Sequence, residues 1–159
     1  MIPQPVYAIV LLFPVSDAIA KLKDSFNDQI DSNSMVYYTK QTVGNACGTI
    51  AVIHALSNID QSLLKNDSPL AAFLRKTCSM SPDERAKAIE VDSIIEEIHK
   101  KFAADGQSEV PASTDRVDEH FIAIVNKDGK LYDLDGTKEG PGNYLIIDVI
   151  SFVMLLFLQ

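Results

Sequence analysis

Cys47 is the residue of this chain whose type and position could supply a nucleophile. It lies at the start of an apolar-periodic stretch, Ala46 to Leu56, which predicts a helix with Asn45 as its N-cap. The attacking species is the thiolate, and the partial positive charge and free N–H groups of a helix start lower a thiol pKa. The same N–H groups could bind an oxyanion, and Gln41, just upstream, could reach it with its side-chain amide.

A candidate base and a carboxylate that could orient it flank a predicted β-hairpin at residues 121–134. His120 precedes the first strand of this hairpin and Asp135 follows the second. A four-residue loop would place His120 directly opposite Asp135, whereas a two-residue turn at Asp128–Gly129 would offset the pair by two positions, still within diagonal reach. In either register the carboxylate can orient one imidazole nitrogen and leave the other free to deprotonate a thiol.

Each of these residues also has an ordinary structural interpretation. A single cysteine on an amphipathic helix is more often a small core residue, and a histidine facing an aspartate is more often a surface pair. Cys78 has no signature around it, and His54, two turns along the helix, is interpreted as a core or surface residue. His99 lies among charged residues and is interpreted as part of a solvated face. The three histidines and two cysteines form no metal-ligand cluster.

The remaining pattern predicts strands at both ends of the chain and helices between them. Val6 to Phe13, closed by Pro14, predicts a strand with apolar residues on both faces, as in the middle of a covered sheet. A loop of Ala104 to Asp118, rich in Asp, Ser, Gly and Pro, separates the helices from the hairpin. The sequence therefore predicts an α/β (α+β layered) domain. The other predicted helices are Asp17–Gln29, Ser68 to Arg75, one beginning at Ser81-Pro82, and Asp92–Ala103.

Length and composition predict one domain with a sizeable core. The chain has 159 residues, of which 47% are hydrophobic, and 14 basic against 22 acidic side chains give a net charge of −8. This balance argues against binding to nucleic acid or anionic lipid and suits a partner with a basic surface. Two cysteines do not make a disulfide framework, so we expect reduced thiols and a cytoplasmic protein, or one that also enters the nucleus. The N-terminus is a poor secretory signal.

The motifs around the candidate residues resemble those of one known family. Gln41-Thr42-Val43-Gly44-Asn45-Ala46-Cys47-Gly48-Thr49-Ile50 resembles the active-site signature of the ubiquitin carboxyl-terminal hydrolases. The segments 118–123 and 131–136 resemble those that carry the histidine and aspartate of that family. The stretch 79–86 is similar to an inter-helical segment of its short, single-domain isozymes, and 5–14 to an early core strand. The resemblance runs from about Pro3 to Pro141 in the family's order.

The resemblance implies a papain-like cysteine-peptidase fold, with a central, mostly antiparallel sheet flanked by helices. It implies a thiol hydrolase that releases small adducts or peptides from the C-terminal glycine of ubiquitin, with Cys47 as nucleophile and His120 as general base and acid. Asp135 would orient the histidine and Gln41 would donate to the oxyanion. No cofactor or metal is implied. The implied partner is ubiquitin, whose binding face is basic, or a related modifier, and we expect a monomer.

The two ends of the chain do not follow the family pattern. The family domain begins before its equivalent of Val6, and after Pro141 it continues to a final strand, so residues 1–141 are interpreted as a partial catalytic domain and 142–159 as a divergent apolar tail. Leu145 to Leu158 is shorter than the roughly 20 residues that span a bilayer, so a core element is expected and a membrane anchor is the alternative. The alternative to an active hydrolase is a truncated, catalytically impaired form that binds ubiquitin or regulates its pathway.

Overall fold

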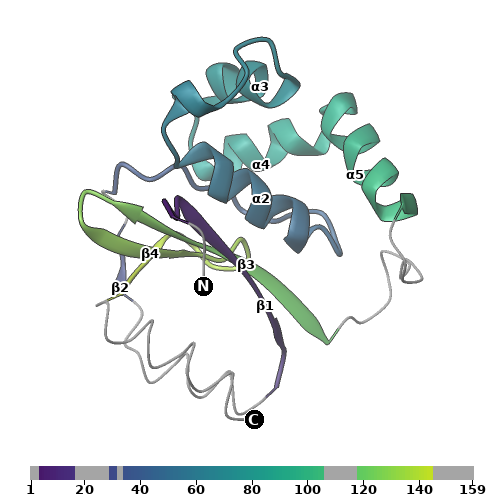
Figure 1. Cartoon of the computed structure of the whole chain (residues 1–159). Helices are drawn as coiled ribbons and strands as arrows, with labels where there is room; N and C mark the ends of the chain where they lie inside the picture. Colours follow the sequence, from purple (N-terminus) through teal and green to yellow (C-terminus); the bar gives the residue numbers. More distant parts are fainter. Residues whose placement is uncertain (1–3, 17–28, 32–33, 106–117, 145–159) are drawn as a thin grey trace.

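The structure places one antiparallel sheet under a layer of helices (Figure 1). It is a computed structural model that describes residues 4–16, 29–31, 34–105 and 118–144. Residues 17–28 of the helix predicted at 17–29 and most of the loop predicted at 104–118 lie outside the described residues, and Gln29, the last residue of that helix prediction, lies in a strand instead. The α/β class and the antiparallel sheet expected from the sequence are both confirmed.

The five described strands run in the order β1-β3-β4-β5-β2, and every neighbouring pair is antiparallel. β3 is the longest strand and receives β1 on one side and β4 on the other, so it is the strand over which the site is built. The bounds are β1 Ala8–Pro14, β2 Gln29–Ile30, β3 Glu119–Lys127, β4 Lys130–Leu134 and β5 Gly142–Tyr144.

The first predicted strand forms as β1 and ends at Pro14. Among the described residues it lies at the edge of the sheet, and not in the middle as its composition predicts. Ile9 is 45% exposed and Leu12 50% exposed, although an unbroken apolar run usually marks a strand covered on both faces. The apolar residues of β1 could be buried on both faces of the strand. The residues that the structure describes cover only part of this apolar surface.

The hairpin takes the shorter of the two turns considered. Lys127 pairs with Lys130, so the turn is the two-residue Asp128–Gly129. Both turn residues have positive φ, 53° and 79°, which is the conformation of a type I′ turn and matches the twist of the strands. His120 lies inside β3 rather than before it, because the strand begins at Glu119. The register therefore offsets His120 and Asp135 by two positions.

The helices α3 (Pro69–Thr77) and α4 (Pro82–Glu90) begin at the serine caps that the sequence predicts, because these start signals are local. Ser68 accepts a hydrogen bond from the Ala71 N–H at the start of α3, and Ser81 forms the complete capping box with Glu84 at the start of α4. The N-cap expected for α2 is wrong. Ala46 occupies that position without a side-chain cap, and Asn45 adopts φ 54°, a left-handed conformation that asparagine tolerates. The bounds are α2 Cys47–Ser57, α3 Pro69–Thr77, α4 Pro82–Glu90 and α5 Ser93–Asp105.

The helix α2 lies between the sheet and the outer helices (Figure 1). One hydrophobic cluster packs it against the sheet and a second packs it against the outer helices. The sheet-side cluster brings small residues of α2 against β3 and β4, and the outer cluster brings larger residues of α2 against α3 and α4. Cys47 is thus the first residue of a helix that is packed on both sides. The clusters comprise Val36, Tyr38, Ala51, Ala55, Ala123, Val125, Tyr132 and Leu134, and Ile50, Ile53, Phe73, Leu74 and Ile89.

Candidate active site

Cys47 begins α2 and its thiol is partly buried. The pKa of the Cys47 thiol is lowered, first by a hydrogen bond with the His120 side chain and then by the backbone N–H groups of Phe121 and Gly48. Burial acts in the opposite direction but does not prevail. The lowered pKa of Cys47 favours its thiolate, which is the state that attacks a carbonyl carbon.

His120 links the thiol to a buried carboxylate. Its Nε2 lies 2.8 Å from Oδ1 of Asp135, and its side chain also makes the hydrogen bond with Cys47. Since Nε2 is occupied by the carboxylate, Nδ1 is the ring nitrogen that remains for the thiol. Asp135, then Cys47, raise the pKa of His120 from 6.5 to about 9, and the partial burial of the ring opposes this. The geometry thus favours a thiolate–imidazolium pair.

Asp135 is held in place by groups that leave it little freedom. Its Oδ1 accepts hydrogen bonds from the Thr137 backbone N–H at 3.0 Å and the Thr137 hydroxyl at 2.7 Å, in addition to His120. The Tyr38 hydroxyl donates to the Asp135 carbonyl oxygen at 2.7 Å. The ring of Phe13, on β1, meets the His120 ring edge-on, with centroids 5.8 Å apart and an interplanar angle of 87°. These contacts fix the imidazole between the carboxylate and the thiol.

Gln41 lines the same cavity as Cys47 and His120. Its backbone N–H donates to the Gly136 carbonyl at 2.8 Å, and its side-chain Nε2 donates to the Val43 carbonyl at 3.2 Å. The Gln41 Oε1 is buried and has no hydrogen-bond partner among the described residues. Gly136 allows this approach, because a Cβ there would lie 2.9 Å from Ile50 Cγ2 and 3.0 Å from Gln41 Cβ. Gly136 is the last residue of the aspartate segment 131–136, but the sequence did not indicate its packing against Gln41.

His54 is a core residue, one of the two interpretations left open. It is fully buried, and its ring stacks on Tyr38 with centroids 5.1 Å apart. Its Nε2 accepts from the Thr39 backbone N–H at 3.1 Å, so Nδ1 carries the proton and donates to the Leu134 carbonyl at 3.1 Å. Burial lowers the pKa of His54 to about 4, so the ring is neutral at pH 7. This neutral ring ties α2 to β4 below the site.

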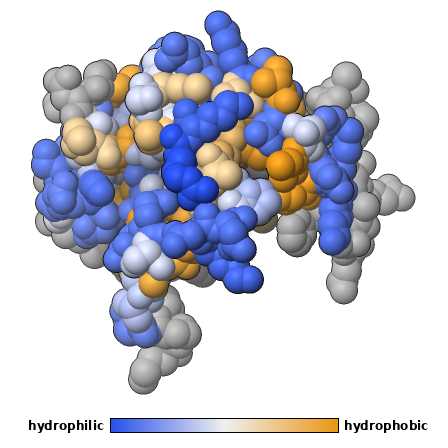
Figure 2. All heavy atoms as spheres, turned by 90° about the horizontal axis from the view of Figure 1, so that it is seen from above, coloured by the Kyte–Doolittle hydropathy of each residue, from blue (hydrophilic) through white to orange (hydrophobic). Residues whose placement is uncertain are grey.

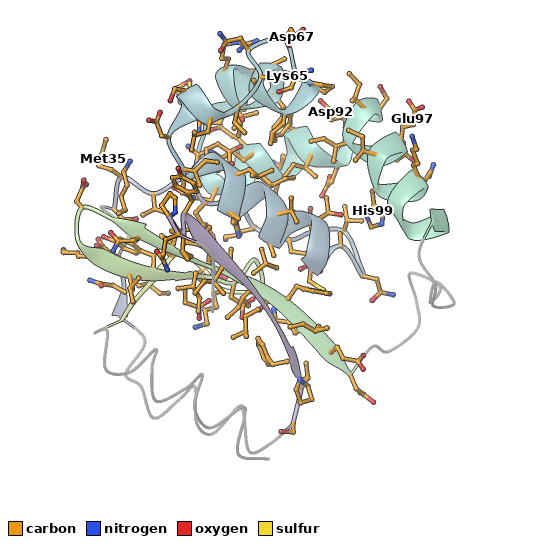
Figure 3. The ribbon with its side chains drawn as sticks, viewed as in Figure 1. Met35, Lys65, Asp67, Asp92, Glu97 and His99 are labelled. Carbon is orange, nitrogen blue, oxygen red and sulfur yellow. The ribbon has the colours of Figure 1, made fainter. Side chains whose placement is uncertain are left out.

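The interpretation of His99 as part of a solvated face is wrong. His99 is half-buried and its Nδ1 lies 2.7 Å from the hydroxyl of Thr49, in the first turn of α2. Figure 3 shows the His99 side chain projecting from α5 on the side that faces α2. The sequence could not indicate this contact, because the charged neighbours of His99 lie on other faces of α5 while its partner is 50 residues away.

The structure therefore brings together all four residues singled out by the motif: Cys47, His120, Asp135 and Gln41. Cys78 is exposed, is the C-cap residue of α3 and does not line the cavity that Cys47 and His120 line. Among the described residues, no three or more His, Cys, Asp or Glu side chains are grouped to hold a metal ion. No helix in the described ranges is long and apolar enough to cross a membrane, and residues 145–158 lie outside those ranges.

Comparison with known proteins agrees with the motifs. A ubiquitin carboxyl-terminal hydrolase of Aplysia californica is 40% identical over 148 residues, covering 89% of this chain and 66% of that protein. For ubiquitin carboxyl-terminal hydrolase 3 of Arabidopsis thaliana the identity is 41%, covering 89% of this chain and 61% of that protein. Human ubiquitin carboxyl-terminal hydrolase isozyme L1 is 38% identical, and the match covers 90% of this chain and 65% of that protein. The chain thus spans less than two thirds of the length of these curated relatives.

Solved structures show the same fold. The UCH37 catalytic domain of Trichinella spiralis, crystallised with ubiquitin vinyl methyl ester, matches with a TM-score of 0.67 at 22% identity, over 96% of this chain and 68% of that one. The model of the family "Ubiquitin carboxyl-terminal hydrolase, family 1" matches residues 1–149. This match extends beyond residue 141, and the end of the catalytic domain at that residue stays a prediction. On the matched family model and the relatives at about 40% identity, this chain belongs to the ubiquitin carboxyl-terminal hydrolases, family 1.

Proposed function

We propose that this chain is a thiol-dependent hydrolase that cleaves small adducts or peptides from the C-terminal glycine of ubiquitin. The observation that carries the proposal is the continuous contact from Cys47 through His120 to Asp135 at the start of α2. A nucleophile, a base and an orienting carboxylate within hydrogen-bond reach form the arrangement that acyl transfer needs.

The chemistry follows from the protonation state of the pair. The Cys47 thiolate attacks the carbonyl carbon of the C-terminal glycine, and the resulting oxyanion accepts hydrogen bonds from the α2 N-terminus and, after its amide turns from Val43, from Gln41. The bond to the leaving group breaks as the His120 imidazolium gives that group its proton. His120 then removes a proton from water, which attacks the thioester and releases a carboxylate and the free thiolate. Asp135 stays ionised and holds the ring throughout.

Ubiquitin is proposed as the partner on two grounds. The relatives are named for ubiquitin, and two solved structural neighbours are bound to ubiquitin vinyl methyl ester. The net charge of −8 suits a partner with a basic face, which ubiquitin is expected to provide. A related modifier remains the alternative substrate. Both cysteines are free thiols, which agrees with a cytoplasmic site of action as a further proposal that microscopy of the tagged chain tests.

Reaction with ubiquitin vinyl methyl ester tests the proposal. The full chain is incubated with the reagent and the modified peptide is identified by mass spectrometry. We expect a covalent adduct on Cys47, and its loss in Cys47→Ala. Cys78→Ala is the matched control, because it removes the chain's other thiol and should leave the adduct intact.

A folded protein that forms no adduct would overturn the proposal for this chain. If ubiquitin still bound to that protein, and bound equally well to Cys47→Ala, the chain would be an impaired ubiquitin-binding form instead. Turnover of a ubiquitin ester that Cys47→Ala abolishes would exclude that alternative. Circular dichroism of each variant shows that the comparison is made between folded proteins.

A further inference from the structure

The Tyr38 hydroxyl lies against both ends of the turn that carries Asp135. It donates to the carbonyl oxygens of Asp135 at 2.7 Å and of Lys138 at 2.6 Å. These carbonyls begin and end one turn, because the Lys138 N–H donates to the Asp135 carbonyl at 3.0 Å. A single phenolic proton is therefore shared between the first and the last residue of the turn.

The segment 38–41 also holds the middle of this turn. The carbonyl of Gly136, the second residue of the turn, accepts a hydrogen bond from the Gln41 backbone N–H at 2.8 Å. Three of the four turn residues thus accept from one short segment, and the same segment carries Gln41, the candidate oxyanion donor. The contacts between the segment and the turn therefore set where the Asp135 carboxylate lies relative to Gln41.

Tyr38 is itself fixed by two helices. Its ring stacks on the His54 ring of α2, with centroids 5.1 Å apart and an interplanar angle of 15°. Its carbonyl accepts a hydrogen bond from Nη1 of Arg85, on α4, at 2.9 Å. Burial, and then the negative charges of Asp135 and Asp133, raise the pKa of Tyr38, so the hydroxyl keeps its proton and remains a donor. Tyr38 is thus a rigid donor that the turn can rest against.

Tyr38 is remote from the space that a substrate can enter. Figure 2 shows the outer surface over the helices, which is largely hydrophilic with hydrophobic patches. Tyr38 contributes almost nothing to the surface, because it is 1% exposed, and it does not line the cavity that Cys47 and His120 line. Any effect of its hydroxyl on the reaction must therefore pass through Asp135.

We propose that Tyr38 is a positioning residue of the site, whose hydroxyl holds the turn 135–138 where the Asp135 carboxylate meets His120. The inference rests on the proposed function, because it adds a residue to the same site. Without the hydroxyl, the Asp135 and Lys138 carbonyls lose their shared donor and the turn can shift. The carboxylate then orients and stabilises the His120 imidazolium less well, and the Cys47 thiolate is favoured less.

Tyr38→Phe tests this proposal, because it removes the hydroxyl and keeps the ring that stacks on His54. The rate of Cys47 alkylation by iodoacetamide is measured from pH 5 to 9, and we expect the profile of the variant to move to higher pH. The kcat for a fluorogenic ubiquitin C-terminal ester should fall about fivefold, the factor that one net hydrogen bond is worth, with little change in KM. Replacing Tyr38 by 4-aminophenylalanine, which has a donor at the same place on the ring, should restore both.

Tyr37→Phe is the matched control. The Tyr37 hydroxyl is hydrogen-bonded to the Thr77 hydroxyl at 2.8 Å, so this variant loses a comparable bond from the neighbouring residue but none at the turn. We expect it to keep the alkylation profile and the kcat of the wild type. Urea unfolding of both variants shows how much stability each one has lost.

A folded Tyr38→Phe chain with the alkylation profile and kcat of the wild type would overturn the inference. Equal changes in Tyr37→Phe would overturn it too, because a general loss of stability would then explain both. A Tyr38→Phe chain that does not fold would give the hydroxyl a role in the fold itself and not in positioning. If the wild-type chain hydrolyses no ester, the hydrolase proposal fails, while the alkylation profiles still decide whether Tyr38 positions Asp135.

Discussion

Replacing Asp135 by asparagine tests the electrostatic origin of the Cys47 thiolate. Asp135 is the largest cause of the raised pKa of His120, from 6.5 to about 9, and His120 is in turn the largest cause of the lowered pKa of Cys47. An asparagine keeps the size of the side chain and can still contact the Thr137 groups, but it carries no charge. The substitution should therefore lower the pKa of His120 and raise that of Cys47 without a change of fold.

The size of the effect follows from the shift itself. The difference between 6.5 and about 9 is roughly 2.5 pKa units, shared between Asp135 and Cys47 with Asp135 first. If Asp135 causes half or more of this rise in the His120 pKa, replacing it should lower that pKa by about one to two units. Each pKa unit is a tenfold change in the equilibrium between the ion pair and the neutral pair. At a pH below the resulting pKa of Cys47, the thiolate fraction should fall by about tenfold or more.

Alkylation by iodoacetamide measures this fraction directly. The rate at Cys47 is followed from pH 5 to 9 by mass spectrometry of the cysteine peptides. Cys78 in the same molecule is the internal reference, because its hydrogen bond goes to the Arg75 carbonyl and not to the His120 pair. We expect the Cys47 profile of Asp135→Asn to move to higher pH and the Cys78 profile to stay. An unchanged Cys47 profile would refute the view that the ion pair sets this thiol's reactivity.

The same substitution has a defined effect on folding. A histidine whose folded pKa is raised above its unfolded value contributes stability that is fully present below the unfolded pKa of about 6.5. That contribution is lost as the pH rises through about 9, the folded pKa of His120. The lowered pKa of Cys47 has the opposite effect, because a thiolate gained on folding adds stability as the pH rises. The contribution of His120 is therefore measured in Cys47→Ala, where Asp135 still raises the His120 pKa: urea unfolding should show a loss of stability as the pH rises above about 6.5, and adding Asp135→Asn should reduce this slope.

Three further predictions concern the scaffold. Ser81→Ala removes the capping box of α4 and should cost about 1 kcal/mol in urea unfolding, and the exposed Ser93→Ala provides a comparison. Arg85→Met should cost about 3 kcal/mol or more in the same assay, because the buried guanidinium donates to three carbonyls, while the exposed Lys87→Met should cost little. The neutral His54, whose pKa is about 4, should make the fold lose stability as the pH falls from about 6.5 towards 4, and an acid titration without that loss would contradict its role.

The parts of the fold that the sequence predicted are those decided locally. The Ser68 and Ser81 caps form within three residues of the chain, so the side chains that make them are visible in the pattern. The His120–Asp135 contact was also accessible, because a hairpin brings its two ends together in either register considered. Both registers left the pair in reach, so the uncertainty in the turn did not affect the predicted contact.

The errors lie where the answer depended on distant parts of the chain. The apolar run of β1 is compatible with a covered strand, but coverage is decided by what packs beside it. His99 has charged neighbours along the sequence, yet its partner Thr49 lies on another helix. Asparagine is a common N-cap residue, but Asn45 adopts a left-handed backbone conformation where the chain turns into α2. Ala46 therefore occupies the N-cap position.

The distance between Cys47 and His120 is the one long-range quantity on which the site depends, and small residues set it. Cys47 lies on α2 and His120 lies on β3. Their side chains can therefore meet only if the helix packs close to the sheet. Ala51 and Ala123 are buried where α2 meets the sheet, which lets the backbones approach closely. The His54–Leu134 hydrogen bond holds the helix against rotation at that distance. The motifs around Cys47 and His120 thus supply the reacting groups, and two alanines, Ala51 about one turn along α2 and Ala123 on β3, let these groups meet.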